Sequence, residues 1–224
     1  MKKIILILIV QIFVWSLVSA EMAPSAVVLK TSGEIELHRQ DDITKLTDGD
    51  ILYNGDEIIS KEQSLAAIRF VDDGAIIKLF SNSILTINTE KAENRLDKNL
   101  YLEVGELWSK VSKEKGAYAI ETPTAVAAVK GTDFLTEVKG SGDTWLFTFE
   151  GVVELKSDLG TVEVDKGKTG IATKDAPPSS RKTEKGEVRK DVSEEIKADV
   201  ETNVMEIEFK DPSGQTKTMK IFYK

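Results

Sequence analysis

Leu65–Leu79, with the sequence LAAIRFVDDGAIIKL, is the stretch that decides the fold class. Two apolar runs, 65–70 and 76–79, flank the turn sequence Asp72-Asp73-Gly74. An Asp-Gly pair between apolar runs indicates a tight hairpin, because a type I′ turn requires a positive φ at both of its central residues. The stretch therefore predicts two antiparallel strands joined at Asp73-Gly74.

The same pattern of short apolar or alternating runs and glycine-containing turns extends outward from Ala26 to Ala172. Many short strands at regular spacing are typical of an all-β domain, built as a sandwich, a barrel or a short β-solenoid. No long helical periodicity competes with this prediction. The expected strands lie at 26–29, 35–37, 65–70, 76–79, 84–87, 100–104, 107–111, 118–120, 134–138, 145–149, 152–155 and 162–164.

The C-terminal part of the chain differs from this β-rich body. Residues 175–190 contain Pro177-Pro178 and then mostly charged residues, which predicts a polar linker. Apolar residues then recur at every fourth position and predict a helix that begins at Asp191. Alternating segments on either side of the turn at 211–214 predict a β-hairpin. A lone hairpin is marginally stable, so its apolar face needs a partner, either the body of the chain or another protein.

The N-terminus has the features of a secretory signal peptide. The basic segment Met1-Lys2-Lys3 precedes an apolar run at 4–18, and small residues follow that suit a cleavage site. We expect cleavage between Ala20 and Glu21, because the run is shorter than the roughly 20 residues of a spanning helix. The mature protein is therefore expected outside the cytoplasmic membrane. The periplasm is the expected location, with secretion or surface association as alternatives.

Composition excludes several classes of site. The 224 residues include no cysteine, one histidine, and 38 acidic against 30 basic residues, which gives a net charge of −8. Without cysteine there is no disulfide, thiolate metal site or cysteine nucleophile, and the lone His38 excludes a site with two histidine ligands. An acidic chain is also poorly suited to bind nucleic acid, because binding of the phosphate backbone requires clustered Lys and Arg side chains. We expect no cofactor and no nucleic-acid partner.

The acidic turns between residues 48 and 56 raise the alternative of a calcium site, because calcium prefers hard oxygen ligands. Asp48, Asp50, Asn54 and Asp56 would supply these oxygens. Their spacing matches neither an EF-hand loop nor the nonapeptide calcium repeat. Turn formation accounts for the same residues, because Asp and Asn side chains bond the backbone of their own turn. We therefore expect turns here and no metal site.

The sequence contains no recognisable catalytic constellation. The carboxylate pairs Asp72-Asp73 and Asp41-Asp42 could in principle perform acid–base chemistry. However, adjacent residues of a strand point to opposite faces, and Asp-Asp-Gly is common turn sequence. No nucleophile motif surrounds His38, and Gly-x-Ser-x-Gly is absent. We expect that the protein is not an enzyme.

An ordered series of short motifs runs through the body of the chain. The motifs are Gly49-Asp50, Gly55-Asp56, Ser64-Leu65-Ala66, Asp73-Gly74, Gly105-Glu106-Leu107, Thr122-Pro123-Thr124-Ala125, Val129-Lys130-Gly131-Thr132-Asp133-Phe134, Glu150-Gly151-Val152-Val153 and Gly167-Lys168. In this order and spacing, the stretch from 46 to 169 resembles the FecR domain family. Each dipeptide is weak alone, but the ordered series is specific.

The resemblance implies an all-β, extracytoplasmic domain without catalytic residues. The best-known members sense a signal in the periplasm, contact an outer-membrane TonB-dependent transducer and control a sigma factor from the inner membrane. Those regulators hold the sigma factor with a cytoplasmic segment that precedes a membrane span, whereas this chain starts with a signal peptide. We therefore expect only the external domain to be shared. Lys130 also replaces the usual arginine before Gly131-Thr132, which keeps the charge but loses the bidentate fork.

These observations predict four segments: a signal peptide at 1–20, a FecR-like β domain at 21–174, a polar linker at 175–190, and a helix with a hairpin at 191–224. The expected function is a non-enzymatic binding or scaffold module of the bacterial cell envelope. A cell-wall or glycan-binding surface protein is the alternative, which a row of exposed tryptophans would favour. The expected partner is another envelope protein or a glycan, and the oligomeric state stays open.

Aromatic side chains and the segment at 130–132 are the candidate partner contacts, because aromatic residues dominate interface energetics. The same aromatic residues would also suit the core of a small β domain, where each buries a large area. The candidates are Trp108, Tyr118, Lys130, Gly131, Thr132, Phe134 and Trp145.

Overall fold

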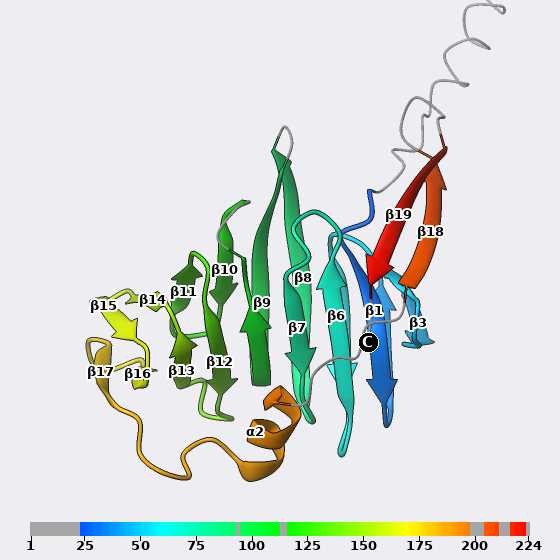
Figure 1. Ribbon diagram of the computed structural model, residues 1–224. Helices are drawn as coiled ribbons and strands as arrows, with labels where there is room; N and C mark the ends of the chain where they lie inside the picture. The colour runs from blue at the N-terminus through cyan, green and yellow to red at the C-terminus, as the bar shows by residue number, and fades with distance from the viewer. Residues whose placement is uncertain (1–22, 93–94, 113–115, 198–203, 211–215, 223–224) are drawn as a thin grey trace, which may run out of the picture.

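The computed structural model of the chain describes residues 23–92, 95–112, 116–197, 204–210 and 216–222. The predicted signal peptide, with its cleavage position at Ala20 and Glu21, lies outside the described residues. No helix within the described ranges is long and apolar enough to cross a membrane. The chain is all-β with a small C-terminal helix, as predicted (Figure 1).

Seventeen strands are hydrogen-bonded into one sheet, which the pairings divide into two layers that share strand β9. Adjacent strands are antiparallel except for β9 and β10, which run parallel. In pairing order, the first layer contains β4 (Ile51–Leu52), β1 (Ala26–Ser32), β6 (Leu65–Phe70), β7 (Ile76–Leu79), β9 (Arg95–Lys110), β12 (Asp133–Val138), β13 (Thr144–Glu150), β16 (Lys168–Ala172) and β17 (Ser179–Lys182). The second layer contains β3 (Asp42–Lys45), β2 (Ile35–Arg39), β5 (Asp56–Ser60), β8 (Ser83–Ala92), β9, β10 (Tyr118–Glu121), β11 (Val126–Val129), β14 (Val152–Ser157) and β15 (Gly160–Asp165).

The long strand β9 belongs to both layers. Its residues 95–104 pair with β8, and its residues 105–110 pair with β12. Gly105 lies where the strand passes from one layer to the other, with a φ of 100°. A Cβ atom at this position would collide with Ser83. The transition therefore requires glycine for both its conformation and its close backbone approach.

The hairpin predicted at residues 65–79 forms, but its turn differs from the predicted one. Strands β6 and β7 pair with Arg69 opposite Ile76. Among the turn residues only Gly74 has a positive φ, so the connection is not a two-residue type I′ turn at Asp73-Gly74. Instead, the Asp73 carboxylate accepts a hydrogen bond from the Ala75 N–H at 2.9 Å and shapes a longer loop.

The two layers pack face to face over one hydrophobic core, which corresponds to the sandwich among the predicted architectures. Alternate residues of strands such as β5 and β10 are buried, as the period of a β-strand requires. The first layer contributes Ile68, Ile77 and Leu107 to this core, and the second contributes Leu85 and Leu102. All five side chains are completely buried.

The C-terminal part contains helix α2 (Lys190–Lys197) and a separate hairpin of β18 (Val204–Lys210) and β19 (Thr216–Phe222). The helix begins one residue before the predicted Asp191. Within the predicted linker, residues 179–182 form β17 and pair with β16. The hairpin is present as predicted, but its side chains lie outside the described residues. Its predicted partner and the predicted domain boundaries stay predictions.

Candidate partner-binding surface

The structure separates the candidate contact residues into three environments. Tyr118 and Phe134 lie in the main core between the layers, so these two aromatic side chains pack instead of presenting a surface. Trp108 and Trp145 belong to a second apolar cluster on the opposite face of the first layer. The turn between β11 and β12 carries Lys130, which is exposed.

The outer face of the first layer is unusually aromatic for a sheet face that points away from the main core. Its residues alternate with core residues: Ile77 and Leu107 point inward, whereas Ile76 and Trp108 point outward. We call this surface the outer aromatic face. It consists of Leu65, Ile76, Phe80, Trp108, Leu135, Trp145, Phe147 and Phe149.

Helix α2 covers the outer aromatic face (Figure 1). Val192 is completely buried against the face, Ile196 packs beside it one helical turn further on, and Val188 packs there from the segment just before the helix. Val192 and Ile196 are four residues apart, which places them on one side of the helix. The helix therefore binds the sheet with a single apolar stripe.

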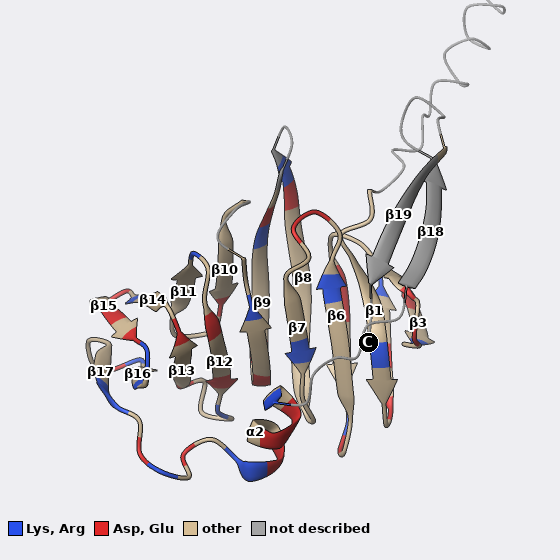
Figure 2. Cartoon of the chain, viewed as in Figure 1, with Lys and Arg blue, Asp and Glu red and all other residues tan. Residues whose placement is uncertain are grey.

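Charged groups flank this apolar contact on both sides, and α2 itself carries residues of both signs (Figure 2). Lys78 is 2% exposed, and its ammonium donates hydrogen bonds to the main-chain carbonyl and the carboxylate of Glu195. Arg189 lies 3.1 Å from the Glu106 carboxylate. Burial raises the pKa of Glu106, and the positive charge of Arg189 partly counteracts this effect. The helix and the residue before it thus supply charge partners for buried groups of the sheet.

Trp108 connects the outer aromatic face to the segment at 131–133. Its indole N–H donates a 2.6 Å hydrogen bond to Asp133, and burial raises the pKa of this carboxyl. Gly131, Thr132 and Asp133 line a groove of about 220 Å³ together with Glu150. The groove and the face are therefore joined through one tryptophan.

Trp145 occupies the other end of the face beside two cations. Its ring centroid lies 5.3 Å from the Lys139 ammonium and 5.7 Å from the Arg181 guanidinium, which are favourable cation–π distances. Arg181 is in turn paired with Glu187, and this pairing lowers the pKa of Glu187. The segment that leads to α2 is thereby attached to the sheet before the helix begins.

Residues 56–154 match the family model described as FecR protein. The resemblance to FecR is confirmed. The match is shorter than the predicted stretch of 46–169, and we call residues 56–154 the FecR segment. No curated protein matches the chain.

Two crystal structures resemble the chain in fold, each of a proposed anti-sigma factor from Parabacteroides distasonis. The structure at 2.50 Å resolution has a TM-score of 0.50 and 16% sequence identity, and the match covers 59% of this chain and 62% of that one. The structure at 1.65 Å resolution has a TM-score of 0.52 and 15% identity, with coverage of 66% and 67%. The chain thus spans about two thirds of the length of these proteins, and the likeness shows the fold alone.

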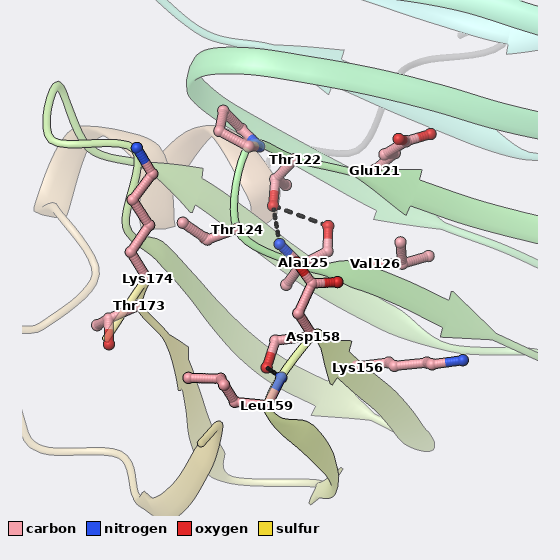
Figure 3. A pocket seen from close by; sticks show the side chains of 12 residues that line it. Glu121, Thr122, Thr124, Ala125, Val126, Lys156, Asp158, Leu159, Thr173 and Lys174 are labelled. Atoms are coloured by element: carbon pink, nitrogen blue, oxygen red, sulfur yellow. Dashed lines mark hydrogen bonds between the residues drawn. The ribbon is translucent and has the colours of Figure 1, made fainter. Parts of the chain in front are cut away.

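Several motifs of the FecR segment form turns that attach one strand to another. In the motif at 122–125, the Thr122 hydroxyl bonds the backbone of Ala125 (Figure 3). The Thr122 and Thr124 hydroxyls also lie 2.7 and 2.8 Å from that of Thr144. At Gly151, a Cβ atom would come within 3.0 Å of Thr132 and Gly131. These motif residues therefore maintain the fold.

The turn at 122–125 also borders an open groove of about 500 Å³ (Figure 3). In Figure 3 the groove lies among the turn that carries Thr122 and Thr124, the turn that carries Leu159, and the segment after β16 that carries Lys174. The lining mixes hydroxyl, charged and short aliphatic side chains. It lacks the aromatic side chains of the outer aromatic face, which is the stronger candidate for a protein partner.

The acidic turn residues considered as calcium ligands bond the backbone or an arginine. Asp48 accepts hydrogen bonds from both the N–H and the hydroxyl of Thr31. Asp56 binds the Arg39 guanidinium with both oxygens, at 2.8 and 2.7 Å. Asp50 and Asn54 accept bonds from backbone N–H groups. These contacts are those of turn and strand anchors.

Sequence reasoning found Trp108 and Trp145 but missed the rest of the outer aromatic face. Phe80, Leu135 and Phe147 each stand next to a core residue, so a short apolar run gave no sign of which residue faced outward. The four-residue period of α2 was the available signal, because an amphipathic helix needs an apolar surface to cover.

Proposed function

We propose that this chain is a non-enzymatic binding or scaffold module of the bacterial cell envelope, which acts outside the cytoplasmic membrane as an external domain of the FecR type. The observation that carries the proposal is the match of residues 56–154 to the FecR family model. The signal-peptide pattern at 1–20 supports the external location. The outer aromatic face supports binding of a protein, because buried aromatic anchors dominate protein interfaces.

The alternative of a glycan-binding surface protein has less support. Stacking on sugars would require exposed tryptophans, but Trp108 is 5% exposed and Trp145 is only partly exposed. A protein partner is therefore the preferred proposal.

Export is tested with alkaline phosphatase fused after Lys224, because this reporter needs disulfides that form only outside the cytoplasm. We expect phosphatase activity and a mature N-terminus at Glu21. The matched control Leu8→Arg interrupts the apolar run and should abolish the activity. An inactive wild-type fusion would contradict the proposed location. Equal phosphatase activity of the wild-type and Leu8→Arg fusions would contradict it as well.

Binding is tested by affinity purification of the tagged full-length chain from envelope extracts, followed by reciprocal purification through the recovered protein. We expect one envelope protein to be recovered in both directions. A parallel column of peptidoglycan should not retain the chain. Retention on peptidoglycan without a protein partner would favour the glycan-binding alternative instead.

A further inference from the structure

We propose that the outer aromatic face is a receptor for an amphipathic helix of a partner protein, and that α2 occupies this receptor in cis and must leave before the partner binds. This inference rests on the proposed function in one respect: it takes the protein that supplies the competing helix to be a partner in the cell envelope. The occupant's chemistry follows from α2 itself, which is the helix seated on the face.

The composition of the face suits an intermolecular contact. Trp108, Phe80 and Phe147 supply large aromatic anchors, whereas α2 contributes only Val192 as a fully buried side chain. Interfaces are enriched in such aromatic residues, particularly at their centres. The aromatic side chains of the face therefore offer a larger contact area than the single buried valine of α2 can fill.

The face also carries charges that a permanent core face would avoid. Lys78 and Glu106 lie among the apolar residues at 2% and 6% exposure. A buried charge is costly unless a partner satisfies it: α2 brings Glu195 to Lys78, and Arg189, directly before α2, reaches Glu106. A surface that exchanges one helix for another keeps such groups because they select the sequence and direction of the incoming helix.

Helix α2 is suited to leave the face. It has eight residues, and isolated helices shorter than about 12 residues are marginal in water, so its helical state depends on docking. Val192 is its one buried residue and lies in the outer cluster instead of the core between the layers, and the helix takes no part in the backbone pairing of the two layers. Its release would therefore leave the layers and their common core in place.

These contacts define the partner helix. It carries apolar residues at i, i+4 and i+8, as at Val188 just before α2 and at Val192 and Ile196 within it. A basic residue follows the first apolar position and an acidic residue precedes the third, matching Arg189 and Glu195. Such a segment would bind the face in the same direction as α2.

The test uses the full-length chain and a fluorescent peptide of residues 186–198. The variant Val192→Asp places a carboxylate against the aromatic residues and should release α2. Because a tethered helix acts at an effective concentration of about a millimolar, the wild-type face is occupied, and the variant should bind the peptide at least about tenfold more tightly. The matched control Lys190→Asp changes a side chain that is 89% exposed and should bind no better than wild type.

A charge exchange tests recognition of the helix sequence. Adding Lys78→Glu to the Val192→Asp variant should weaken peptide binding, and a peptide with Glu195→Lys should restore it. Equal binding of the peptide to wild type and to Val192→Asp would overturn the proposal. A folded Val192→Asp variant that binds no peptide would overturn it as well.

Hydrogen exchange tests the opening of α2 in the wild-type chain. The amides of residues 194–197 should exchange by local opening, well before those of β9. Equal protection of the amides of α2 and β9 from exchange would overturn the proposal. A wild-type dimer, detected by its molecular mass, in which two copies exchange their α2 helices would overturn it as well. These measurements need no envelope partner, so their failure is distinguishable from a failure of the export and purification experiments.

Discussion

Lys98 illustrates how a residue that looks ordinary in the sequence becomes an anchor in the structure. Its ammonium is completely buried and donates hydrogen bonds to Asp72 at 2.9 Å and to Asp73 at 3.0 Å. It also lies 5.4 Å from the centre of the Phe70 ring. The paired carboxylates of the turn therefore hold a buried lysine of β9, which gives both of them a structural role.

Replacement of Lys98 should strongly destabilise the fold. In Lys98→Met the two carboxylates of Asp72 and Asp73 remain without their buried cation, and we expect the free energy of unfolding to fall by about 3–5 kcal/mol. Urea denaturation followed by circular dichroism measures this loss. The control Lys98→Met/Asp72→Asn/Asp73→Asn removes the unpaired charges and should recover part of it. A loss below about 1 kcal/mol would contradict the anchor role.

Titration of Glu106 should make the stability of the folded protein depend on pH. Burial raises its pKa above the usual 4.5, so the folded chain holds this proton more tightly than the unfolded chain. Its contribution to stability is therefore fully present below pH 4.5 and is lost as the pH rises through the raised folded-state pKa.

Glu106→Gln tests this pH dependence, because it removes the titrating group and should stabilise the variant relative to wild type progressively above pH 4.5. Urea denaturation at a series of pH values measures the difference. The companion variant Arg189→Met should raise the pKa of Glu106 further, as followed by carbon NMR of its carboxyl group. A wild-type pH profile in Glu106→Gln would contradict the assignment.

At the scale of the elements, the sequence predicts two separate strands, 100–104 and 107–111, where the structure has β9. The structure has one continuous strand, because Gly105 bends the chain from one layer to the other without ending the ladder. A glycine signals that a positive φ is possible, but only the packing against Ser83 decides that the strand continues.

Gly105→Ala should disrupt this bend. The substitution combines a positive φ with a collision against Ser83, and we expect a loss of more than about 3 kcal/mol in the free energy of unfolding. Gly55→Ala is the matched control, because Gly55 has a φ of 88° and nothing within 4 Å of the new Cβ, so it should lose only about 1 kcal/mol. Both values come from urea denaturation. Equal losses would contradict the close approach at Gly105.

Two other strands were not predicted from the sequence, for a related reason. Strands β3 and β17 consist mostly of polar residues, DITK and SSRK, and neither shows an inward-facing apolar pattern. They form because a neighbouring strand offers its backbone groups, and this pairing does not depend on apolar side chains. The helix α2 was predicted to within one residue, because its apolar period is a local signal.

At the scale of the whole molecule, β9 couples the two layers. It pairs with β8 and β10 in the second layer and with β7 and β12 in the first. The layers also share one core, so neither can lose its packing while the other stays intact. We therefore expect a single cooperative unfolding transition of the two layers.

Leu102→Ala tests this coupling from the second layer. Leu102 is completely buried, and its truncation should cost about 2–5 kcal/mol. Tryptophan fluorescence, which includes Trp108 and Trp145 of the first layer, should shift together with the circular dichroism signal. The control Val126→Ala, at a side chain that is 36% exposed, should change stability by less than about 0.5 kcal/mol. A fluorescence transition that stays at the wild-type midpoint would contradict the coupling.

The sequence by itself determined the all-β class, the hairpin at 65–79, the position of α2 and the FecR resemblance, because turn residues, strand alternation and helical period are local signals. Only the tertiary structure decided which side of each first-layer strand faces the core. In adjacent apolar pairs such as Trp108 beside Leu107, the choice depends on the register with neighbouring strands. That register places Trp108, Phe147 and Leu135 on one outer surface and brings α2 across it.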